Sequence, residues 1–390
     1  MANKKLKVIS FKNCPSPYMI PYYNMLLDEF DLNVLFMTVD PYNAKWKGVL
    51  EPAKFKYEFM KTRYLRLKFG IDYYDFYFGS GIKKYLKEFG DLDCFICSGW
   101  NSISTYLALK YCKKHKIPFI IFNESTSQEK SLRRTLFLPY IKYIIRNADA
   151  CLVAGSRAKK FDVMMGANPK DVFVQGYCVD NNKFISATAL LKKDINLKEK
   201  LGFNKSSKLV LYVGQIIKRK GIDNLFEIFT EFNNEGENIE LVLLGTGPLE
   251  EYYKKQIVQN GIKNIHFKGF IQQDEILKYY AIADAFVLPS YEETWGLVVN
   301  EAMCAALPVI VSKRAGSSED LVKHGKNGFV FDPNKKNELK SYILRICNND
   351  SLKYQMGKVS LEIIKKQSPE NTALMISRCI RHAITKVKKD

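Results

Sequence analysis

The stretch Asp284–Gly316, DAFVLPSYEETWGLVVNEAMCAALPVIVSKRAG, contains the pattern that decides the fold. Its first apolar residues, 285–288, form a short run that stops at a proline, which predicts a buried strand. A polar loop ending at Gly296 follows, and the apolar and small residues from Leu297 onward predict a helix packed closely on a sheet. The apolar run Val309–Val311 predicts the next strand. Strand, loop, helix and strand in this order are typical of a parallel α/β sheet.

The same alternation runs through most of the chain. In the first half we expect strands at Lys7–Ser10, Leu32–Met37, Cys94–Cys97, Pro118–Phe122, Ala150–Val153 and Val172–Val174, and helices at Pro21–Glu29, Ser102–His115 and Ser131–Asn147. In the second half we expect further strands at Leu209–Gly214, Ile239–Leu244, Asn264–Lys268 and Gly328–Phe331, and helices at Gly221–Asn233 and Leu249–Gln259. The aromatic-rich stretch Trp46–Phe78 has no clear period and is left unassigned.

The length of the chain predicts two domains, because 390 residues exceed the usual size of a single core. Hydrophobic residues make up 47% of the chain and charged residues 26%, as in globular proteins. We place the domains at 1–185 and 186–368, with a helix in 369–390, and treat the polar segment 181–207 as the linker. Ligands of such α/β sheets bind at the carboxyl ends of the strands.

The net charge of +19 is unevenly distributed: residues 1–185 carry +12 and residues 186–390 carry +7. This excess predicts an anionic partner for the first half, such as a lipid surface, a phosphorylated acceptor or nucleic acid. A lysine-rich, solvated surface without a partner is the alternative.

Two glutamates flank the predicted helix start in the second half. The free amides at the helix N-terminus form an anion site suited to a diphosphate, and Gly296 lets the backbone approach closely. Glu301 lies about one turn into the helix, where its carboxylate can accept hydrogen bonds from paired hydroxyls such as a ribose diol. Glu293 lies in the loop, on the side where a sugar would lie. Two ordinary surface carboxylates are the alternative.

This spacing, followed by Leu307–Ile310, resembles the E-x7-E signature of the family 4 retaining glycosyltransferases. Further segments with counterparts in that family are Gly214–Gly221, Leu244–Leu249, Phe267–Phe270, Gly325–Phe329, Asn147–Ser156, Gly176–Phe184 and Pro15–Pro21. The resemblance spans the chain and is strongest over 209–331. It implies the glycosyltransferase-B fold, in which two Rossmann-like α/β domains face each other across a cleft and the C-terminal helix packs back toward the first domain.

The family's donor-site roles are carried over to the matching residues. Lys220 is expected to pair with the donor phosphates, where a compact ammonium stabilises the leaving group. Glu301 is expected to hold the ribose and Glu293 the sugar, so Lys220 and Glu293 are the candidate catalytic residues. The remaining candidates are Gly214 and Gly245 near the diphosphate, Phe270 near the base, and Gly296 and Leu297 at the phosphate amides.

The sequence departs from the family pattern at several positions. Gln215 replaces a phosphate-binding arginine, and Arg219 or Lys218 is expected to substitute. Met19 replaces an arginine of the opening loop, and the histidine that many members carry in the first domain has no match. The acceptor-side candidates, all in the first half, are Tyr18, Trp100 and Glu124.

The sequence predicts no cofactor and no metal. The histidines, His115, His266, His324 and His382, lack metal-ligand spacing. Asp91 and Asp93 precede a strand, so we expect a turn and a cap there. Most of the nine cysteines lie in apolar stretches, and Cys94 and Cys97 are expected to be buried, since free cysteine is among the most buried residues.

The function predicted by the resemblance is the transfer of a sugar, with retention of configuration, from a nucleoside-diphosphate sugar to a hydroxyl acceptor. We expect a role in surface-polysaccharide (lipopolysaccharide) or lipid-linked glycan assembly. The alternatives are a nucleotide-sugar 2-epimerase of the same fold and a non-enzymatic nucleic-acid-binding protein, although no nucleic-acid motif is present. The donor sugar, its base and the acceptor stay open.

We expect the protein to be cytoplasmic and attached peripherally to the inner face of the membrane. The apolar run before Lys12 is too short for a secretory signal, and no run is long enough to span a bilayer. The segment Leu132–Arg146 combines an apolar face with basic flanks, which suits an anionic membrane surface or, alternatively, a core helix with a solvated edge.

Overall fold

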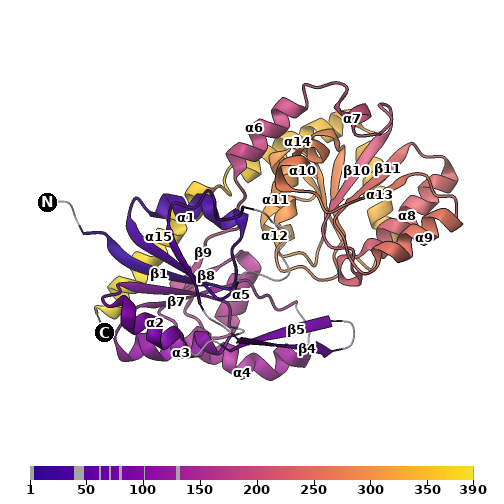
Figure 1. The fold of residues 1–390 in the computed structure, drawn as a ribbon. Helices are drawn as coiled ribbons and strands as arrows, with labels where there is room; N and C mark the ends of the chain where they lie inside the picture. The colour runs from indigo at the N-terminus through magenta and orange to yellow at the C-terminus, as the bar shows by residue number, and fades with distance from the viewer. Residues whose placement is uncertain are drawn as a thin grey trace. The chain divides into compact units, whose positions relative to one another are not determined.

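The structure, a computed structural model, describes residues 4–38, 48–60, 63–69, 72–78, 81–100, 102–128 and 132–389, with the backbone alone for 63–69, 72–78 and 132–134. Figure 1 shows two compact units, which are described separately. Unit 1 contains Met1–Tyr177 and Pro369–Asp390, and unit 2 contains Cys178–Ser368. The predicted end of the first domain at 185 therefore lies inside helix α6 (Asn181–Leu191).

The main sheet of unit 1 is parallel and has the strand order β3-β2-β1-β6-β7-β8-β9. Its strands are β1 (Leu6–Lys12), β2 (Phe30–Phe36), β3 (Lys56–Phe59), β6 (Cys94–Ser98), β7 (Phe119–Asn123), β8 (Ala150–Val153) and β9 (Val172–Val174). The central strands are nearly continuous apolar runs, as expected for a parallel sheet buried on both faces. The helices are α1 (Ile20–Leu26), after the 3-10 turn η1 (Pro17–Met19), α2 (Ile82–Phe89), α3 (Ile103–Lys114), α4 (Leu132–Asn147), α5 (Ser156–Met164) and α15 (Pro369–Val387), and the 3-10 turn η2 (Pro169–Asp171) precedes β9.

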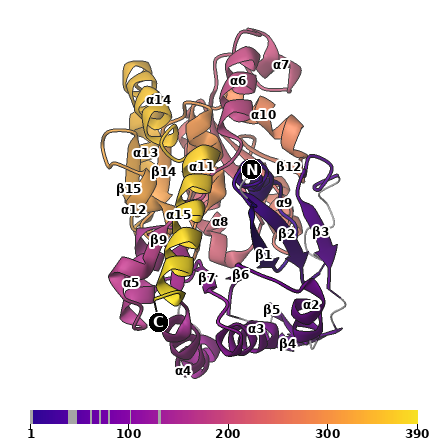
Figure 2. The ribbon, with the colours of Figure 1, turned by 90° about the vertical axis from the view of Figure 1, so that its left-hand side faces the viewer.

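Helix α15 returns the chain to unit 1, where it contacts α1 and β8 (yellow in Figure 2). Glu29 fixes this contact, because its carboxylate accepts hydrogen bonds from Ser377 Oγ and Arg381 Nη2, each at 2.7 Å. These two bonds lower the pKa of Glu29.

The unassigned stretch Trp46–Phe78 contains strands in the part that the structure describes. β3 is the edge strand of the main sheet, whereas β4 (Arg63–Phe69) and β5 (Asp72–Phe78) pair with each other as an antiparallel hairpin. Aromatic residues are common in strands, but apolar and polar residues do not alternate regularly here. The hydrophobic pattern therefore did not predict these strands.

Unit 2 contains a second parallel sheet with the strand order β12-β11-β10-β13-β14-β15. Its strands are β10 (Lys208–Val213), β11 (Ile239–Leu244), β12 (Ile265–Gly269), β13 (Ala285–Leu288), β14 (Val309–Ser312) and β15 (Gly328–Phe331). Its helices are α6, α7 (Leu197–Lys200), α8 (Ile222–Glu235), α9 (Glu250–Gln259), α10 (Gln273–Ile282), α11 (Leu297–Cys304), α12 (Ser317–Leu321), α13 (Lys336–Cys347) and α14 (Asp350–Ile364), and the 3-10 turn η3 (Lys218–Lys220) precedes α8. The predicted pair of parallel α/β domains is confirmed.

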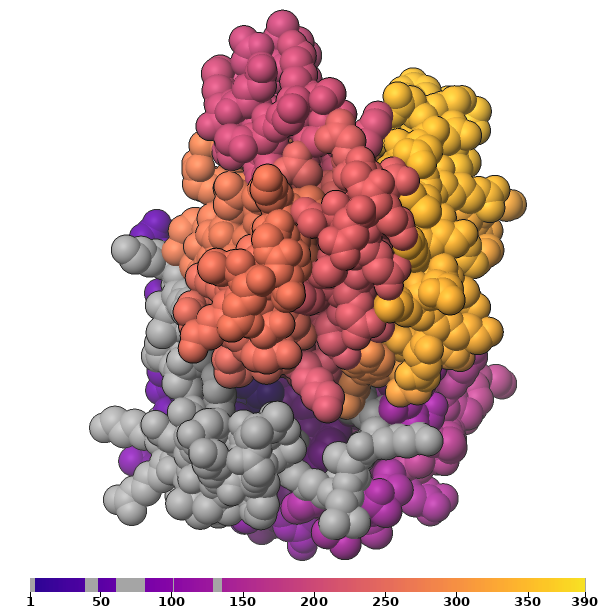
Figure 3. Space-filling view, turned by 90° about the vertical axis from the view of Figure 1, so that its right-hand side faces the viewer, coloured from indigo at the N-terminus to yellow at the C-terminus, as the bar shows by residue number. Residues whose placement is uncertain are grey.

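Helices cover both faces of the unit 2 sheet. Buried side chains of α8, α9 and α13, among them Phe229 and Tyr253, pack against one face of the sheet and form a single apolar core with it. The outer surface of α8 and α9 lies in the coral region of Figure 3. On the other face, the ring of Tyr280 in α10 lies against the ring of Phe286 in β13.

The predicted linker 181–207 is wrong, because the structure places helices α6 and α7 there. Phe184 is fully buried with its ring against Tyr280, and Asn181 Nδ2 donates to the carbonyl of Ile364 at 2.8 Å. The many Lys and Asn residues of this segment conceal one apolar stripe that packs on α10 and α11.

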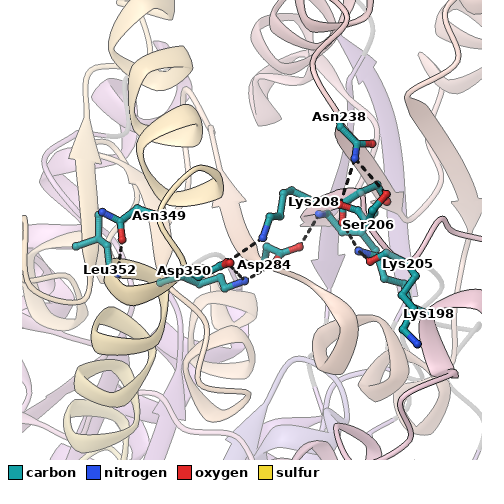
Figure 4. Close-up of polar contacts among 12 residues, drawn as sticks. Lys198, Lys205, Ser206, Lys208, Asn238, Asp284, Asn349, Asp350 and Leu352 are labelled. Carbon is teal, nitrogen blue, oxygen red and sulfur yellow. Dashed lines mark hydrogen bonds and ion pairs between the residues drawn. The ribbon is translucent and has the colours of Figure 1, made fainter.

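Asp284 fixes the amino ends of β10 and β13 (Figure 4). Its carboxylate accepts hydrogen bonds from the backbone N–H of Leu209 at 2.8 Å and from Lys353 Nζ at 2.6 Å. Lys353 also pairs with Asp350 at the start of α14, and Asp350 pairs with Lys208. The network ties two neighbouring strands to one helix, at the edge opposite the strands' carboxyl ends.

We expect Asp284→Ala to lower the free energy of unfolding of unit 2 by about 1–3 kcal/mol, because the Asp284 side chain is only 12% exposed and its loss leaves the buried backbone N–H of Leu209 without an acceptor and Lys353 with Asp350 alone. Asp274, which is 77% exposed in its pair with Lys183, is the control, and Asp274→Ala should cost less than about 1 kcal/mol. Urea denaturation measures both. Equal losses would show that Asp284 does not hold the two strands.

Candidate active site

Two glycine-containing loops meet at the carboxyl edge of the unit 2 sheet. The loop after β10 begins at Gly214 (φ +156°) and the loop after β11 at Gly245 (φ +134°). A Cβ on Gly245 would lie 1.9 Å from the carbonyl oxygen of Gly214, so the close contact requires glycine. The backbone N–H of Ile216 donates to the carbonyl of Thr246 at 3.1 Å and joins the loops further along. The structure thus brings the predicted residues Gly214 and Gly245 together.

A buried tyrosine supports the first of these loops from below. Tyr212 is fully buried in β10, and its hydroxyl donates to the carbonyl of Gln215 at 2.9 Å. Burial and the Glu293 carboxylate raise the pKa of Tyr212, which therefore remains a neutral donor. Gln215 itself is exposed.

The loop after β10 is joined to the loop after β13. The carbonyl of Arg219 accepts hydrogen bonds from the backbone N–H groups of Tyr291 at 2.9 Å and Glu292 at 3.3 Å. Gly221 (φ +70°) lies against Pro289, and a Cβ there would lie 2.3 Å from the Pro289 carbonyl oxygen. Any side chain at position 221 would therefore clash with the Pro289 carbonyl.

Lys220 and Glu293 form an ion pair between these two loops, and each side chain is only 12% exposed. The backbone holds Glu293 as well, since its carbonyl accepts from Gly316 N at 3.0 Å and Glu293 bridges to Ala315. A poorly solvated ion pair interacts more strongly than a surface pair but costs desolvation on both sides. The alternative that Glu293 is an ordinary surface carboxylate is therefore wrong.

The N-terminus of α11 begins beside this ion pair. Gly296 is the N-cap (φ +94°), and a Cβ there would lie 2.6 Å from Leu288 Cδ2. The helix starts at Leu297, and the amides of Leu297 and Val298 precede the first i−4 hydrogen bond, whereas Val299 N donates to the carbonyl of Gly296 at 2.9 Å. Trp295, 4% exposed, fixes the loop by donating from Nε1 to Asn300 Oδ1 at 3.0 Å.

Glu301 is 2% exposed and accepts a hydrogen bond on Oε2 from the hydroxyl of Tyr280 at 2.7 Å. The surface alternative is thus wrong for Glu301 too. Tyr280 was missed by the sequence reasoning, because it comes from α10, the helix before β13, and carries no local signal. Phe270, the candidate near the base, is half-buried immediately after β12.

The acceptor-side candidates lie in unit 1, after the carboxyl ends of its strands. Trp100 follows β6 and donates from Nε1 to Ser125 Oγ at 3.3 Å, and Glu124 follows β7 and accepts from the hydroxyl of Tyr177. Trp100 and Glu124 are thus held at neighbouring strand ends. Tyr18 lies half-buried in η1, after β1.

A buried hydrogen-bond chain beneath this loop was also missed. Asn123 Nδ2 donates to Asp162 Oδ1 at 2.5 Å, and Asn123 Oδ1 accepts from Ser125 N at 3.0 Å. Asp162 has no exposed surface, and burial raises its pKa to about 7. These hydrogen bonds orient Asn123 and Ser125, which flank Glu124 in the sequence.

The predicted structural roles of cysteine and histidine match the contacts. Cys94 and Cys97 are buried and free, and burial raises the pKa of Cys97 to about 12. His266 pairs with Glu240 at 2.6 Å and His382 with Asp171 at 2.8 Å. Across the described ranges, no group of three or more His, Cys, Asp or Glu residues could hold a metal ion. Asp93 accepts from the backbone N–H of Lys7 in β1 at 2.8 Å, so it ties the start of β6 to the neighbouring strand and does not form the expected local cap.

Comparison with known proteins gives the same fold and a family. Residues 193–361 match the family described as glycosyl transferases group 1. A glycosyltransferase of Methanocaldococcus jannaschii is 30% identical over 47% of each chain, and the alpha-monoglucosyldiacylglycerol synthase of Acholeplasma laidlawii is 35% identical over 42% of this chain and 40% of its own. The chain thus spans less than half the length of these two relatives.

Solved structures match nearly the whole chain. HepE of Anabaena, solved in complex with UDP, has a TM-score of 0.75 and 16% identity, with 96% of this chain and 99% of that chain covered. A glycosyltransferase of Rickettsia africae also gives 0.75, at 12% identity and with 98% and 99% covered. Residues 193–361 are therefore a segment of the glycosyl transferases group 1 type, in agreement with the E-x7-E resemblance, and the molecule has the glycosyltransferase-B fold.

Proposed function

We propose that the protein is a retaining glycosyltransferase that takes its sugar from a nucleoside-diphosphate donor bound by unit 2. The observation that carries this proposal is the buried Lys220–Glu293 pair beside the N-terminus of α11, inside the segment that matches the family. UDP is the first nucleotide to test, because HepE was solved with UDP. The family match favours this reading over the 2-epimerase and nucleic-acid alternatives.

Each group of the unit 2 site has a distinct role in the proposal. The Lys220 ammonium and the amides at Gly296 and Leu297 receive the diphosphate, since a cation and a helix N-terminus both stabilise phosphate charge. Glu301, oriented by Tyr280, accepts the ribose hydroxyls. The close-packed glycine loops at 214 and 245 allow the backbone to approach the diphosphate, and Phe270 lies near the base.

In the proposed reaction, the bond between the sugar's anomeric carbon and the phosphate oxygen breaks. The acceptor oxygen forms its new bond on the same face, and its proton passes to the departing phosphate. Lys220 stabilises the negative charge that develops on that phosphate. Glu293, released from Lys220 when the donor binds, contacts the sugar.

No metal is needed in this proposal, because Lys220 and the α11 amides supply the positive charge that neutralises the leaving diphosphate. Arg219, exposed on the same loop, is the cation expected to substitute for the arginine replaced by Gln215.

For the acceptor we propose a lipid-linked hydroxyl, reached from an anionic membrane surface. Helix α4 supports this, because it exposes apolar side chains as well as burying them: Ile141, Ile144 and Ile145 are buried in the core, whereas Leu136 and Phe137 are 72% and 39% exposed. Lys142 and Arg146 are exposed on the same helix, and the side chains of Arg133 and Arg134 lie outside the described residues.

The described helices contain no stretch both long and apolar enough to cross a bilayer. A peripheral contact needs only a few basic groups, each contributing about 1 kcal/mol near an anionic surface. The relative from Acholeplasma laidlawii is named as a glycolipid synthase, which fits a lipid acceptor.

We expect Lys220→Ala to reduce sugar transfer from UDP-sugar by about 10²–10³-fold, the usual loss when one charge-stabilising group is removed. Lys263→Ala, which is exposed before β12 at the opposite edge of the same sheet, is the control and should stay within a few-fold of the wild-type rate. Steady-state kinetics measure both. Near-normal turnover in Lys220→Ala would remove Lys220 from the site.

Glu301→Ala should weaken binding of UDP itself, and Tyr280→Phe should weaken it less, because the phenol only orients the carboxylate. Calorimetry with UDP and with 2′,3′-dideoxy-UDP isolates the ribose contribution. Wild-type protein should prefer UDP, and both variants should lose part of that preference. Variants that bind the two nucleotides less well by the same factor would indicate a structural role only.

Activity should persist in excess EDTA, because Lys220 and the α11 amides neutralise the diphosphate. Transfer assays before and after chelation measure this. Loss of activity that Mn²⁺ or Mg²⁺ restores would contradict the proposal.

The protein should co-sediment with anionic vesicles at low salt and be released as salt rises, because screening weakens the attraction. Changing Arg133, Arg134, Lys142 and Arg146 together to Gln should lower vesicle binding and leave UDP affinity intact. The matched control changes four exposed lysines of unit 2, Lys205, Lys255, Lys263 and Lys358. Equal recovery with anionic and neutral vesicles would exclude the membrane surface.

A further inference from the structure

Three side chains line up across neighbouring strands at the carboxyl edge of the unit 1 sheet. Phe11 pairs with Cys97 between β1 and β6, so Lys12 and Ser98 come next in register, and Ser98 pairs with Phe122 between β6 and β7. Neighbouring residues in register point to the same face of a sheet. Ser98 therefore lies between Lys12 and Phe122.

The Lys12 ammonium lies over aromatic rings, 4.5 Å from the ring centroid of Phe122 and 5.6 Å from that of Tyr23. Among the described residues it has no hydrogen bond and no ion pair. Rings can hold a lysine in place, but they satisfy none of its three N–H donors. The Tyr23 hydroxyl is already bonded to Ser10 Oγ at 2.6 Å.

The hydroxyl between them is also without a partner. Ser98 Oγ is buried and makes no hydrogen bond to any residue that the structure describes. A buried hydroxyl without a partner costs free energy, so such groups are commonly completed by a ligand or water. An ammonium and a hydroxyl on adjacent strands together offer donors to one oxyanion.

This pair is continuous with the acceptor-side candidates. The Phe122 ring contacts the Tyr177 ring edge-on, with centroids 5.8 Å apart, and the Tyr177 hydroxyl donates to Glu124. Strand ends of parallel sheets are where ligands bind in α/β domains.

We propose that Lys12 and Ser98 form an anion subsite that binds the phosphate group of a phosphorylated acceptor. The inference rests on the proposed transferase function and specifies its acceptor as a phosphate ester. The ammonium and the hydroxyl donate to the phosphate oxygens, and the ring of Phe122 supports the lysine stem.

The test uses the full chain with its donor site saturated by UDP, so that phosphate cannot bind there. Methyl phosphate and inorganic phosphate are titrated separately and followed by ³¹P NMR. Methyl phosphate should bind the wild type at least as tightly as inorganic phosphate does. Lys12→Gln should weaken methyl phosphate binding about tenfold or more, consistent with the loss of a charge-assisted hydrogen bond.

The controls separate an anion-binding role from a structural one. Lys12→Arg should retain most of the affinity, and Ser98→Ala should weaken it several-fold. Lys110, whose Nζ lies 5.0 Å from the Tyr106 ring centroid, is the matched cation–π lysine, and Lys110→Gln should leave binding unchanged.

Unchanged methyl phosphate affinity in both Lys12→Gln and Ser98→Ala would overturn the subsite. Binding of inorganic phosphate alone would overturn the acceptor assignment. If UDP does not bind, the proposed function is contradicted and the subsite is tested separately. Methyl phosphate is then titrated into Lys220→Ala without nucleotide, and adding Lys12→Gln to this variant should weaken the binding by the same factor.

Discussion

The ion pair between Lys220 and Glu293 holds together the two loops on which the unit 2 site depends. Neither side chain is well solvated, so each needs the other until a ligand replaces it. The contact between Gly221 and Pro289 brings these loops close enough for the pair to form. In the proposed mechanism, the donor diphosphate takes over Lys220 and thereby releases the Glu293 carboxylate toward the sugar, so the pair would be a preformed half of the donor site.

The donor site could be predicted from the sequence because its parts lie in short contiguous segments at strand ends. Strands β8, β9, β11, β13 and β15 begin and end where the apolar runs predicted, and α11 begins at Leu297 as expected. The glycines at 214, 245 and 296 were also predicted. Their tight contacts with neighbouring backbone or side-chain atoms explain why no other residue type serves there.

Other features could not be predicted, because they depend on contacts between residues that are far apart in the sequence. Tyr280 bonds to Glu301 from α10, the helix before β13, and Asp162 bonds to Asn123 from α5. Neither pair has a sequence spacing that predicts the contact. The segment 181–207 was misread because its composition favours a linker, while a few buried residues, among them Phe184, Leu197 and Phe203, hold it against unit 2. In the sequence, Lys12 only marks the end of the first apolar run. The register of β1, β6 and β7 is what places it beside Ser98 and Phe122.

The central claim is that the Lys220 ammonium exchanges its carboxylate partner for the donor diphosphate. NMR of protein labelled with ¹³C-lysine tests this directly, with the Lys220 Cε resonance identified by its absence from Lys220→Arg. If Lys220 exchanges Glu293 for the diphosphate, this resonance shifts on addition of UDP and of pyrophosphate, and stays in place on addition of uridine, which lacks phosphate. A Lys220 resonance that does not move at saturating UDP would contradict it.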